Sequence, residues 1–301
     1  MPAAEVGISP ELVRRLLAAQ HPDLAGLPVR VLATGWDNLT CRLGADLVVR
    51  LPRRAAAAGL VRHEQRWLPR LAPRLPLPVP VPVRTGTPAL GYPWHWSIAA
   101  YLPGRPASDC PPADPELAAA AIGGFLGAMH APAPADAPVN AVRGVPLADR
   151  AAAFKSRLGQ LGGRADVRAI AAAWAAALDA PRWDGPALWL HGDLHPANIL
   201  VDRGRVSGVI DFGDLTAGDP ATDLSVAWAL LPPGSHAGFR SAYHAAGGHA
   251  VTGGTWARAR GWAVGLAVAI LANSADNRAM EAVARRTLAA ALRTPPVSQP
   301  G

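Results

Sequence analysis

The sequence is poor in cysteine and in long apolar runs, and each scarcity excludes a class of protein. Its two cysteines, Cys41 and Cys110, show neither metal-site spacing nor a disulfide framework. The longest apolar run, residues 262–272, has only about half the length that crosses a bilayer, so we expect no membrane partner. The first residues lack the basic and apolar segments of a secretion signal. We therefore expect a cytoplasmic protein.

Lysine is almost absent, since Lys155 is the only one among 29 basic residues and the others are arginine. The formal net charge of +7 is compatible with nucleic acid, a membrane surface or a phosphorylated ligand. The arginines are scattered, however, and their densest stretch, 50–74, lacks interleaved aromatic residues that would stack on bases. We therefore expect no nucleic-acid partner.

The first hundred residues read as a small region rich in strands. Ser9 and Pro10 begin a helix that runs to residue 20. Strands are expected at 29–32, 39–43 and 47–51, joined by tight turns, and a helix at 55–71. The proline series 73–82 reads as an extended connector to a strand at 92–98.

Beyond a Pro-Gly turn at residues 103–104 the composition becomes helical. The expected helices are 116–130, 147–161, 167–178, 221–230, 237–246 and 255–292, the last broken near Gly261 or Ser274. A frayed tail is expected at 295–301. With half of its 301 residues apolar, the chain is predicted to be an α+β protein with a small lobe, 1–102, and a larger helical lobe, 103–301.

The segment 190–214, LHGDLHPANILVDRGRVSGVIDFGD, is the most informative part of the chain. Asp193 precedes Asn198 by five residues, and Asn198 precedes Asp211 by thirteen. Phosphoryl transfer needs a carboxylate to take the acceptor's proton, and oxygen ligands that hold Mg²⁺ on the phosphates. Asp193 fits the first role, and Asn198 and Asp211 fit the second. Singly each residue is more typical of a loop cap or turn, but their joint spacing between apolar runs favours catalysis.

Two histidines in the same segment suggest an alternative. His191 and His195 are four residues apart, as in some zinc sites. Gly192 and Pro196 argue against the continuous helix that such a pair requires, and no convincing third ligand follows. We expect His191 to brace the loop by hydrogen bonds instead.

These residues resemble the His-Gly-Asp-x-x-x-x-Asn and Ile-Asp-Phe-Gly segments of the aminoglycoside phosphotransferase family, a branch of the protein-kinase-like fold. The run at 218–224 is similar to that family's Gly-Asp-Pro-x-x-Asp-Leu, and 126–130 is similar to its Leu-x-x-Leu-His helix end. The resemblance implies a bilobal fold with Asp193 as the catalytic base and Asn198 and Asp211 as Mg²⁺ ligands. It makes Asp223 a structural anchor for the loop, and the alternative is a carboxylate at a helix amino terminus.

A kinase-like small lobe should also supply a phosphate-covering turn. The four residues in the corresponding place are Gly35, Trp36, Asp37 and Asn38. They are not the glycine-rich pattern of protein kinases, and an ordinary turn would look the same.

The third strand ends in Arg50 where protein kinases carry lysine, and the small lobe contains no lysine. Arg50 is therefore the expected phosphate contact, with Arg53 as second choice, since a guanidinium binds phosphate oxygens bidentately. A surface arginine is the alternative. Glu64 is the only acidic residue between Asp46 and Asp109, and we predict that it pairs with Arg50.

Three hypotheses remain open. The first is a small-molecule kinase that uses Mg²⁺ and ATP or GTP to phosphorylate a hydroxyl of an aminoglycoside-like antibiotic or another hydroxylated metabolite, as in antibiotic resistance. The second is a catalytically impaired nucleotide-binding pseudokinase, and the third is a metal-dependent hydrolase. An aminoglycoside requires an acidic pocket, for which Asp214, Asp219 and Asp223 lie near the loop in sequence. The sequence does not indicate an oligomeric state.

Overall fold

The computed structural model describes residues 3–273 and 277–293, and the tail expected at 295–301 lies outside them. The chain divides into two compact units. The N-terminal unit contains residues 1–73, 78–103 and 211–213, and the C-terminal unit contains 74–77, 104–210 and 214–301. Among the described residues, no helix combines the length and the hydrophobicity that a membrane span needs.

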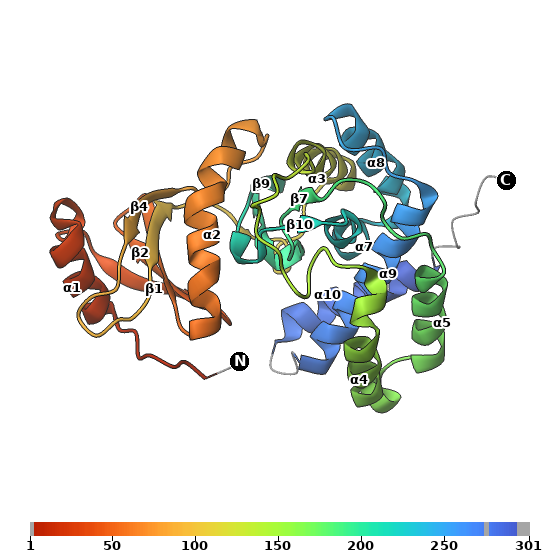
Figure 1. Ribbon diagram of the computed structural model, residues 1–301, viewed down its shortest axis with the longest axis horizontal. Coiled ribbons are helices and arrows are strands. Elements are labelled where there is room, and N and C mark those ends of the chain that lie inside the picture. Colours follow the sequence, from red (N-terminus) through yellow and green to blue (C-terminus); the bar gives the residue numbers. More distant parts are fainter. Residues whose placement is uncertain (1–2, 274–276, 294–301) are drawn as a thin grey trace. The chain divides into compact units, whose positions relative to one another are not determined.

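The N-terminal unit is an antiparallel sheet between two helices. The strands, in the spatial order β1-β2-β3-β5-β4, are β1 (Val29–Thr34), β2 (Asn38–Leu43), β3 (Leu47–Pro52), β5 (Trp96–Ala100) and β4 (Pro82–Gly86). Helices α1 (Pro10–Gln20) and α2 (Ala55–Leu71) cover opposite faces of this sheet (Figure 1). The side chain of Ser9 accepts a hydrogen bond from the Leu12 N–H and so caps α1.

The alternation of side chains along β3 decides which residues meet which helix. Val49 and Leu51 are fully buried in the core that α1 closes with Leu16. Arg50 lies between them and therefore points to the other face, where α2 carries Glu64. The pleat thus directs a basic residue to the one acidic residue of this helix.

Two strands near the proline series differ from expectation. The end of that series forms β4, an edge strand beside β5. Pro82 is tolerated there because it is the first residue of an edge strand, where its missing N–H removes no bond from the interior of the sheet. The expected strand at 92–98 begins only at Trp96, since Tyr92 forms an isolated bridge with Ala89 instead. Pro93, which cannot donate to a ladder, separates the two.

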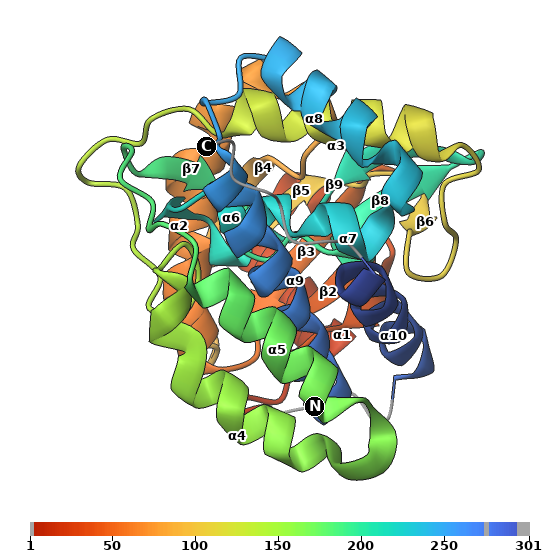
Figure 2. The ribbon, with the colours of Figure 1, turned by 90° about the vertical axis from the view of Figure 1, so that its right-hand side faces the viewer.

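The C-terminal unit is mainly helical. Its helices are α3 (Pro115–Met129), α4 (Ala151–Leu161), α5 (Val167–Leu178), α6 (Ala221–Leu224), α7 (Val226–Leu230), α8 (His236–Ala245), α9 (Gly253–Asn273) and α10 (Arg278–Arg293). Helix α9 runs through the middle, with α4 and α5 on one side and α10 on the other (Figure 2). Of the two expected break points in the helix 255–292, Gly261 lies inside α9, and Ser274 lies outside the described residues, between the end of α9 at Asn273 and the start of α10 at Arg278. A 3-10 turn, Leu147–Arg150, precedes α4, and the expected helix 221–230 is interrupted at Ser225.

Short strands frame the segment that carries the motif. Strand β7 (Leu188–Leu190) pairs with β10 (Thr216–Gly218), and β8 (Ile199–Asp202) pairs with both β6 (Arg105–Pro106) and β9 (Arg205–Val209). β7 enters and β8 leaves the loop 191–198, and both strands are buried except at Asp202. Because both ends of the loop are fixed in ladders, its polar side chains are presented from a rigid frame.

Candidate active site

The backbone of the loop 191–198 is anchored by Asp223 of α6. This carboxylate is fully buried and accepts hydrogen bonds from the backbone N–H groups of His191 at 2.7 Å and Gly192 at 2.9 Å. The His130 side chain, at the end of α3, lies 3.3 Å from the same carboxylate. Asp223 therefore joins three separate segments of the C-terminal unit.

Gly192 is required by the path of this loop. Its φ is +86°, in the region that favours glycine. A Cβ atom there would lie 2.2 Å from the backbone oxygen of Asp214. The segments around Gly192 and Asp214 pass close to each other, and this brings the carboxylates of Asp193 and Asp214 near one another.

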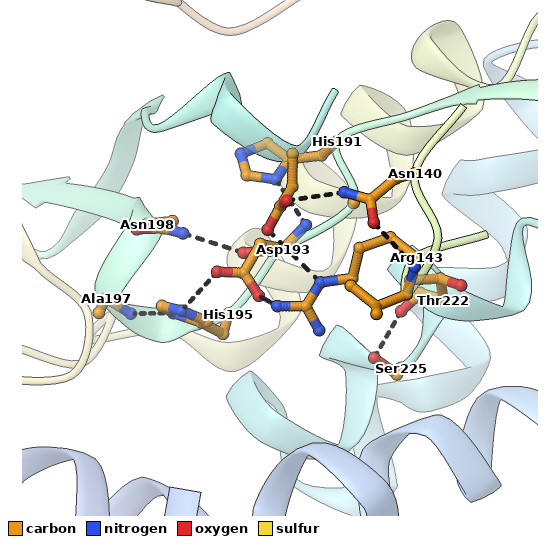
Figure 3. Close-up of polar contacts among 12 residues, drawn as sticks. Asn140, Arg143, His191, Asp193, His195, Ala197, Asn198, Thr222 and Ser225 are labelled. Carbon is orange, nitrogen blue, oxygen red and sulfur yellow. Dashed lines mark hydrogen bonds and ion pairs between the residues drawn. The ribbon is translucent and has the colours of Figure 1, made fainter. Parts of the chain in front are cut away.

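The two histidines brace the loop and leave no nitrogen for a metal. The Nδ1 of His191 accepts from the Asp193 N–H at 3.2 Å, and its Nε2 lies 2.9 Å from the Ile210 oxygen. The Nδ1 of His195 accepts from the Ala197 N–H at 3.2 Å, and its Nε2 lies 3.4 Å from the Asp193 carboxylate (Figure 3). Since both rings use both nitrogens, and no group of three potential ligands occurs among the described residues, the zinc hypothesis loses its ligands.

Asn198 is held close to Asp193 by its own side chain. Its Nδ2 donates to the Asp193 backbone oxygen at 2.9 Å, and its backbone oxygen accepts from the Ile210 N–H at 2.9 Å. Only 7% of the residue is exposed. The amide oxygen is the atom that remains for a cation, and oxygen ligands suit Mg²⁺.

The Asp193 carboxylate is flanked by Arg143 and His195. Arg143 forms an ion pair with its Oδ1, and His195 lies beside its Oδ2 (Figure 3). Burial alone would raise the pKa of Asp193, but the charge of Arg143 and then that of His195 outweigh it and hold this pKa well below its usual range. About a quarter of the side chain, 26%, remains exposed. The arrangement suits a group that must be ionised when an acceptor arrives.

Arg143 is a residue of the candidate site that the sequence did not suggest. Its Nε lies 3.5 Å from the Asp214 carboxylate, which also accepts from the Asn140 side chain at 2.8 Å. The segment 138–144 is tied down by further bonds, among them Gly144 N–H to Thr222 Oγ1 at 3.1 Å. Arg143 is 50 residues before Asp193, and no motif surrounds it, so only the fold brings the two together.

The three carboxylates expected to line an acidic pocket are already used inside the protein. Asp214 is paired with Arg143, and Asp223 anchors the loop. Asp219 is 3% exposed and binds Arg258 of α9 at 2.7 Å. The three aspartates that lie near the loop in sequence therefore already have partners within the protein.

In the N-terminal unit, Arg50 forms the ion pair with Glu64 that the sequence predicts. Its Nη1 lies 2.7 and 2.9 Å from the two Glu64 oxygens, and its Nη2 lies 2.8 Å from Asp211 Oδ1. Burial opposes the charge, but Glu64 and Asp211 raise the pKa of Arg50 above its usual value. Asp211 has a φ of +66°, an unusual conformation for a residue with a side chain and one that clusters at functional sites.

The turn at 35–38 is held by the two arginines that follow β3. Arg53 donates to the Gly35 backbone oxygen at 2.7 Å, and Arg54 pairs with the Asp37 carboxylate. Trp36 is half exposed, and Asn38 begins β2. Arg53, the second choice for a phosphate contact, thus has a structural bond of its own, while the role of the turn in nucleotide binding stays a prediction.

The chain is similar to a family of known proteins and to solved structures. A family model described as the phosphotransferase enzyme family matches residues 28–262. The macrolide 2′-phosphotransferase MphH from Brachybacterium faecium is 26% identical, with a TM-score of 0.61 over 95% of this chain and 98% of its own. A GDP and kanamycin complex of APH(2″)-IIIa is 19% identical, with a TM-score of 0.66 over 92% of this chain and 99% of its own. The expected α+β, kinase-like fold is confirmed.

A curated relative matches a shorter stretch. The uncharacterized protein YcbJ of Bacillus subtilis (strain 168) is 37% identical over 67 residues. This stretch is 22% of the present chain and 22% of that relative.

Proposed function

The chain belongs to the phosphotransferase enzyme family, and we propose that it transfers the γ-phosphate of ATP or GTP to a hydroxyl group of a small molecule. The observation that carries this proposal is the position of Asp193. It is a partly exposed carboxylate on a loop whose backbone is fixed by a buried anchor. A carboxylate held in this position can accept the proton of a hydroxyl that binds beside it.

The chemical step follows from these roles. The acceptor hydroxyl donates a hydrogen bond to the Asp193 carboxylate, and its oxygen attacks the γ-phosphorus. A new O–P bond forms, the bond between the γ-phosphorus and the bridging oxygen breaks, and the electron pair leaves on the nucleoside diphosphate. The hydroxyl proton moves to Asp193 and then to solvent.

Asn198 and Asp211 would hold Mg²⁺. Each supplies an oxygen donor, and Mg²⁺ in such sites is bound by one or two protein groups together with phosphate oxygens and water. When bound, the ion neutralises charge that develops on the phosphates. Asn198 fits this role because its amide nitrogen is already bonded to the loop backbone.

Arg50 would take the place of the lysine that contacts the donor phosphates, with Glu64 holding its guanidinium. The turn formed by Gly35, Trp36, Asp37 and Asn38 would cover the nucleotide. The GDP complex of the APH(2″)-IIIa relative supports a nucleotide as the donor. Nucleotide use, together with the scarcity of cysteine, favours a cytoplasmic protein.

The acceptor would be a hydroxylated antibiotic or metabolite. The relatives include a macrolide 2′-phosphotransferase and a phosphotransferase in complex with kanamycin, and these ligands are consistent with a role in antibiotic resistance. Among the classes represented, the macrolide enzyme has the higher identity, 26% against 19%.

The test is nucleotide consumption and acceptor phosphorylation by Asp193→Asn. Asp202→Asn is the matched control, because it is an exposed aspartate at the end of the adjacent β8. Loss of a general base lowers turnover by about 10²–10⁴-fold, and we expect this loss at Asp193 alone. If the wild-type protein binds nucleotide but turns over no more than Asp193→Asn does, the protein is the pseudokinase of the alternative hypothesis.

A further inference from the structure

A buried tyrosine of α8 lies at the far end of the polar contacts that support the loop 191–198. The hydroxyl of Tyr243 lies 3.1 Å from Nδ1 of His130, and Nε2 of His130 lies 3.3 Å from the Asp223 carboxylate. The same carboxylate anchors the loop by accepting two of its backbone N–H groups. A continuous series of polar contacts therefore runs from α8, by way of the end of α3 and α6, to the backbone of the loop.

The direction of these hydrogen bonds follows from the chemistry of the three groups. Tyr243 and Asp223 have no exposed surface, and only 1% of His130 is exposed. An ionised carboxylate only accepts, so the hydrogen of a neutral His130 ring is on Nε2, and Nδ1 is left as an acceptor. Burial and the charge of Asp223 raise the pKa of Tyr243 above its usual value, so its hydroxyl keeps the proton that it donates to Nδ1.

Close packing of α3 and α8 sets the place of the phenol. The two helices lie side by side (Figure 2). A Cβ atom at Gly127 of α3 would lie 2.3 Å from the Tyr243 backbone oxygen, and one at Gly248 would lie 2.5 Å from Cε1 of the Tyr243 ring. The rings of Tyr243 and His130 meet edge to face, with their centroids 5.5 Å apart. The position of the hydroxyl beside Nδ1 is therefore built into the helix packing.

We propose that Tyr243 is a positioning residue for phosphoryl transfer, which acts through His130 on the Asp223 carboxylate and thereby on the loop that carries Asp193. The proposal rests on the proposed function, since it takes Asp193 to be the base. The hydroxyl occupies Nδ1 and so keeps the Nε2 hydrogen directed at Asp223. Without the hydroxyl, Nδ1 is a buried acceptor that has lost its partner, and a ring that rotates to satisfy it withdraws Nε2 from the carboxylate.

The perturbation is Tyr243→Phe in the full chain, which removes only the hydroxyl. Tyr92→Phe is the matched control, because Tyr92 is 1% exposed and its hydroxyl donates at 2.9 Å to the Pro52 backbone oxygen of the N-terminal unit. Each variant loses one buried hydrogen bond. If Tyr243 had a structural role alone, the two variants would lose similar stability and neither would alter the loop or the rate of the chemical step.

Amide hydrogen exchange tests the link to the loop without any substrate. We expect Tyr243→Phe to lower the protection of amides 191 and 192 by roughly two- to tenfold, the factor of one net hydrogen bond, relative to the amide of Val264 in the buried part of α9. Tyr92→Phe should leave this ratio unchanged. An equal loss of protection at Val264 in Tyr243→Phe would overturn the proposal.

A double-mutant cycle tests whether the effect passes through His130. His130→Gln keeps an N–H donor but has no ring nitrogen for the phenol, so Tyr243→Phe should cause no further loss of protection in that background. A full loss there would contradict the proposal. The nitrogen-15 shifts of the His130 ring decide the same point in the wild type if His130→Gln fails to fold. We expect the hydrogen on Nε2, and a hydrogen on Nδ1 would refute the assigned direction.

Turnover tests the consequence for the chemistry, measured as consumption of ATP and of GTP with kanamycin or a macrolide antibiotic as the acceptor. In Tyr243→Phe we expect kcat to fall by on the order of fivefold, a part of the roughly 10²-fold cost of a 1 Å misplacement. The KM for the nucleotide should stay unchanged, because Arg50, the expected phosphate contact, belongs to the N-terminal unit. A kcat within about twofold of the wild type would refute the positioning role. Equal turnover by the wild type and Asp193→Asn would refute the kinase function itself, and the exchange ratio would still decide whether Tyr243 supports the loop.

Discussion

Removing the loop anchor should release the catalytic loop and destabilise the C-terminal unit. The perturbation is Asp223→Ala. It deletes the acceptor of two backbone N–H groups, those of His191 at 2.7 Å and Gly192 at 2.9 Å, and the neighbour of His130 at 3.3 Å. Asp223 has no exposed surface, so the donors that it leaves behind are not directly hydrated.

The magnitude follows from those contacts. A hydrogen bond to a charged group is worth about 1.5–3 kcal/mol, and the loss is felt in full when the remaining partner stays buried. Two such bonds give roughly 3–6 kcal/mol, and water that enters the space of the carboxylate recovers part of it. We therefore expect a loss of about 3–4 kcal/mol in the free energy of unfolding, near the range for breaking a buried charged pair.

Urea unfolding measures the global loss, and amide hydrogen exchange at residues 191 and 192 measures the local one. Asp223→Asn is a milder change. Its amide oxygen can accept a hydrogen bond from one of the two backbone N–H groups, whereas its amide NH₂ group is a donor and cannot accept from the other. We therefore expect about half the loss in the free energy of unfolding that Asp223→Ala causes. Asp202→Ala is the exposed control and should stay within about 0.5 kcal/mol of the wild type. A loss below about 1 kcal/mol in Asp223→Ala, with protection at both amides unchanged, would refute the anchoring argument.

Three further predictions concern the other charged residues and the glycine of the site. Arg143→Gln removes the charge that lowers the pKa of Asp193 and leaves the burial that raises it; the acid limb of the pH–rate profile should therefore move to higher pH, and a profile that stays in place would contradict this. Arg50→Ala leaves the Glu64 carboxylate, 4% exposed, without this cation and should cost about 3 kcal/mol by urea unfolding, whereas Arg50→Lys keeps the charge and should lose less than half of that. Gly192→Ala combines a φ of +86° with a clash against backbone, and we expect less soluble protein and a lower melting temperature than for Gly124→Ala, where a Cβ meets nothing within 4 Å.

Elements that are encoded locally were predictable to the residue. Helices α2 and α5 have the bounds 55–71 and 167–178 that periodicity and flanking residues indicate. The side chain of Asp166 caps α5 by accepting from the Ala169 N–H at 3.0 Å. Strand β4 was not predictable in the same way, because an edge strand that begins with proline is defined by its neighbour β5 and not by its own pattern.

The candidate site likewise contains residues that could be predicted from the local sequence and one that could not. Asp193, Asn198 and Asp211 lie in one short segment, so their joint spacing predicted a phosphoryl-transfer site. The Arg50–Glu64 pair was predictable because Glu64 is the only carboxylate available on α2. Arg143 was not, since its position depends on the bonds that fix 138–144 to 214–222, and those bonds connect residues 76 and 78 positions apart.

Pocket charge shows most clearly why the acceptor could not be inferred from sequence. Three aspartates within ten positions suggest an acidic surface, but a carboxylate attracts a ligand only while it is not already neutralised. Asp219 forms an ion pair with Arg258, and Asp214 forms one with Arg143. The charge of a binding site is therefore set by which charges remain unpaired after folding, and the sequence does not show those pairings.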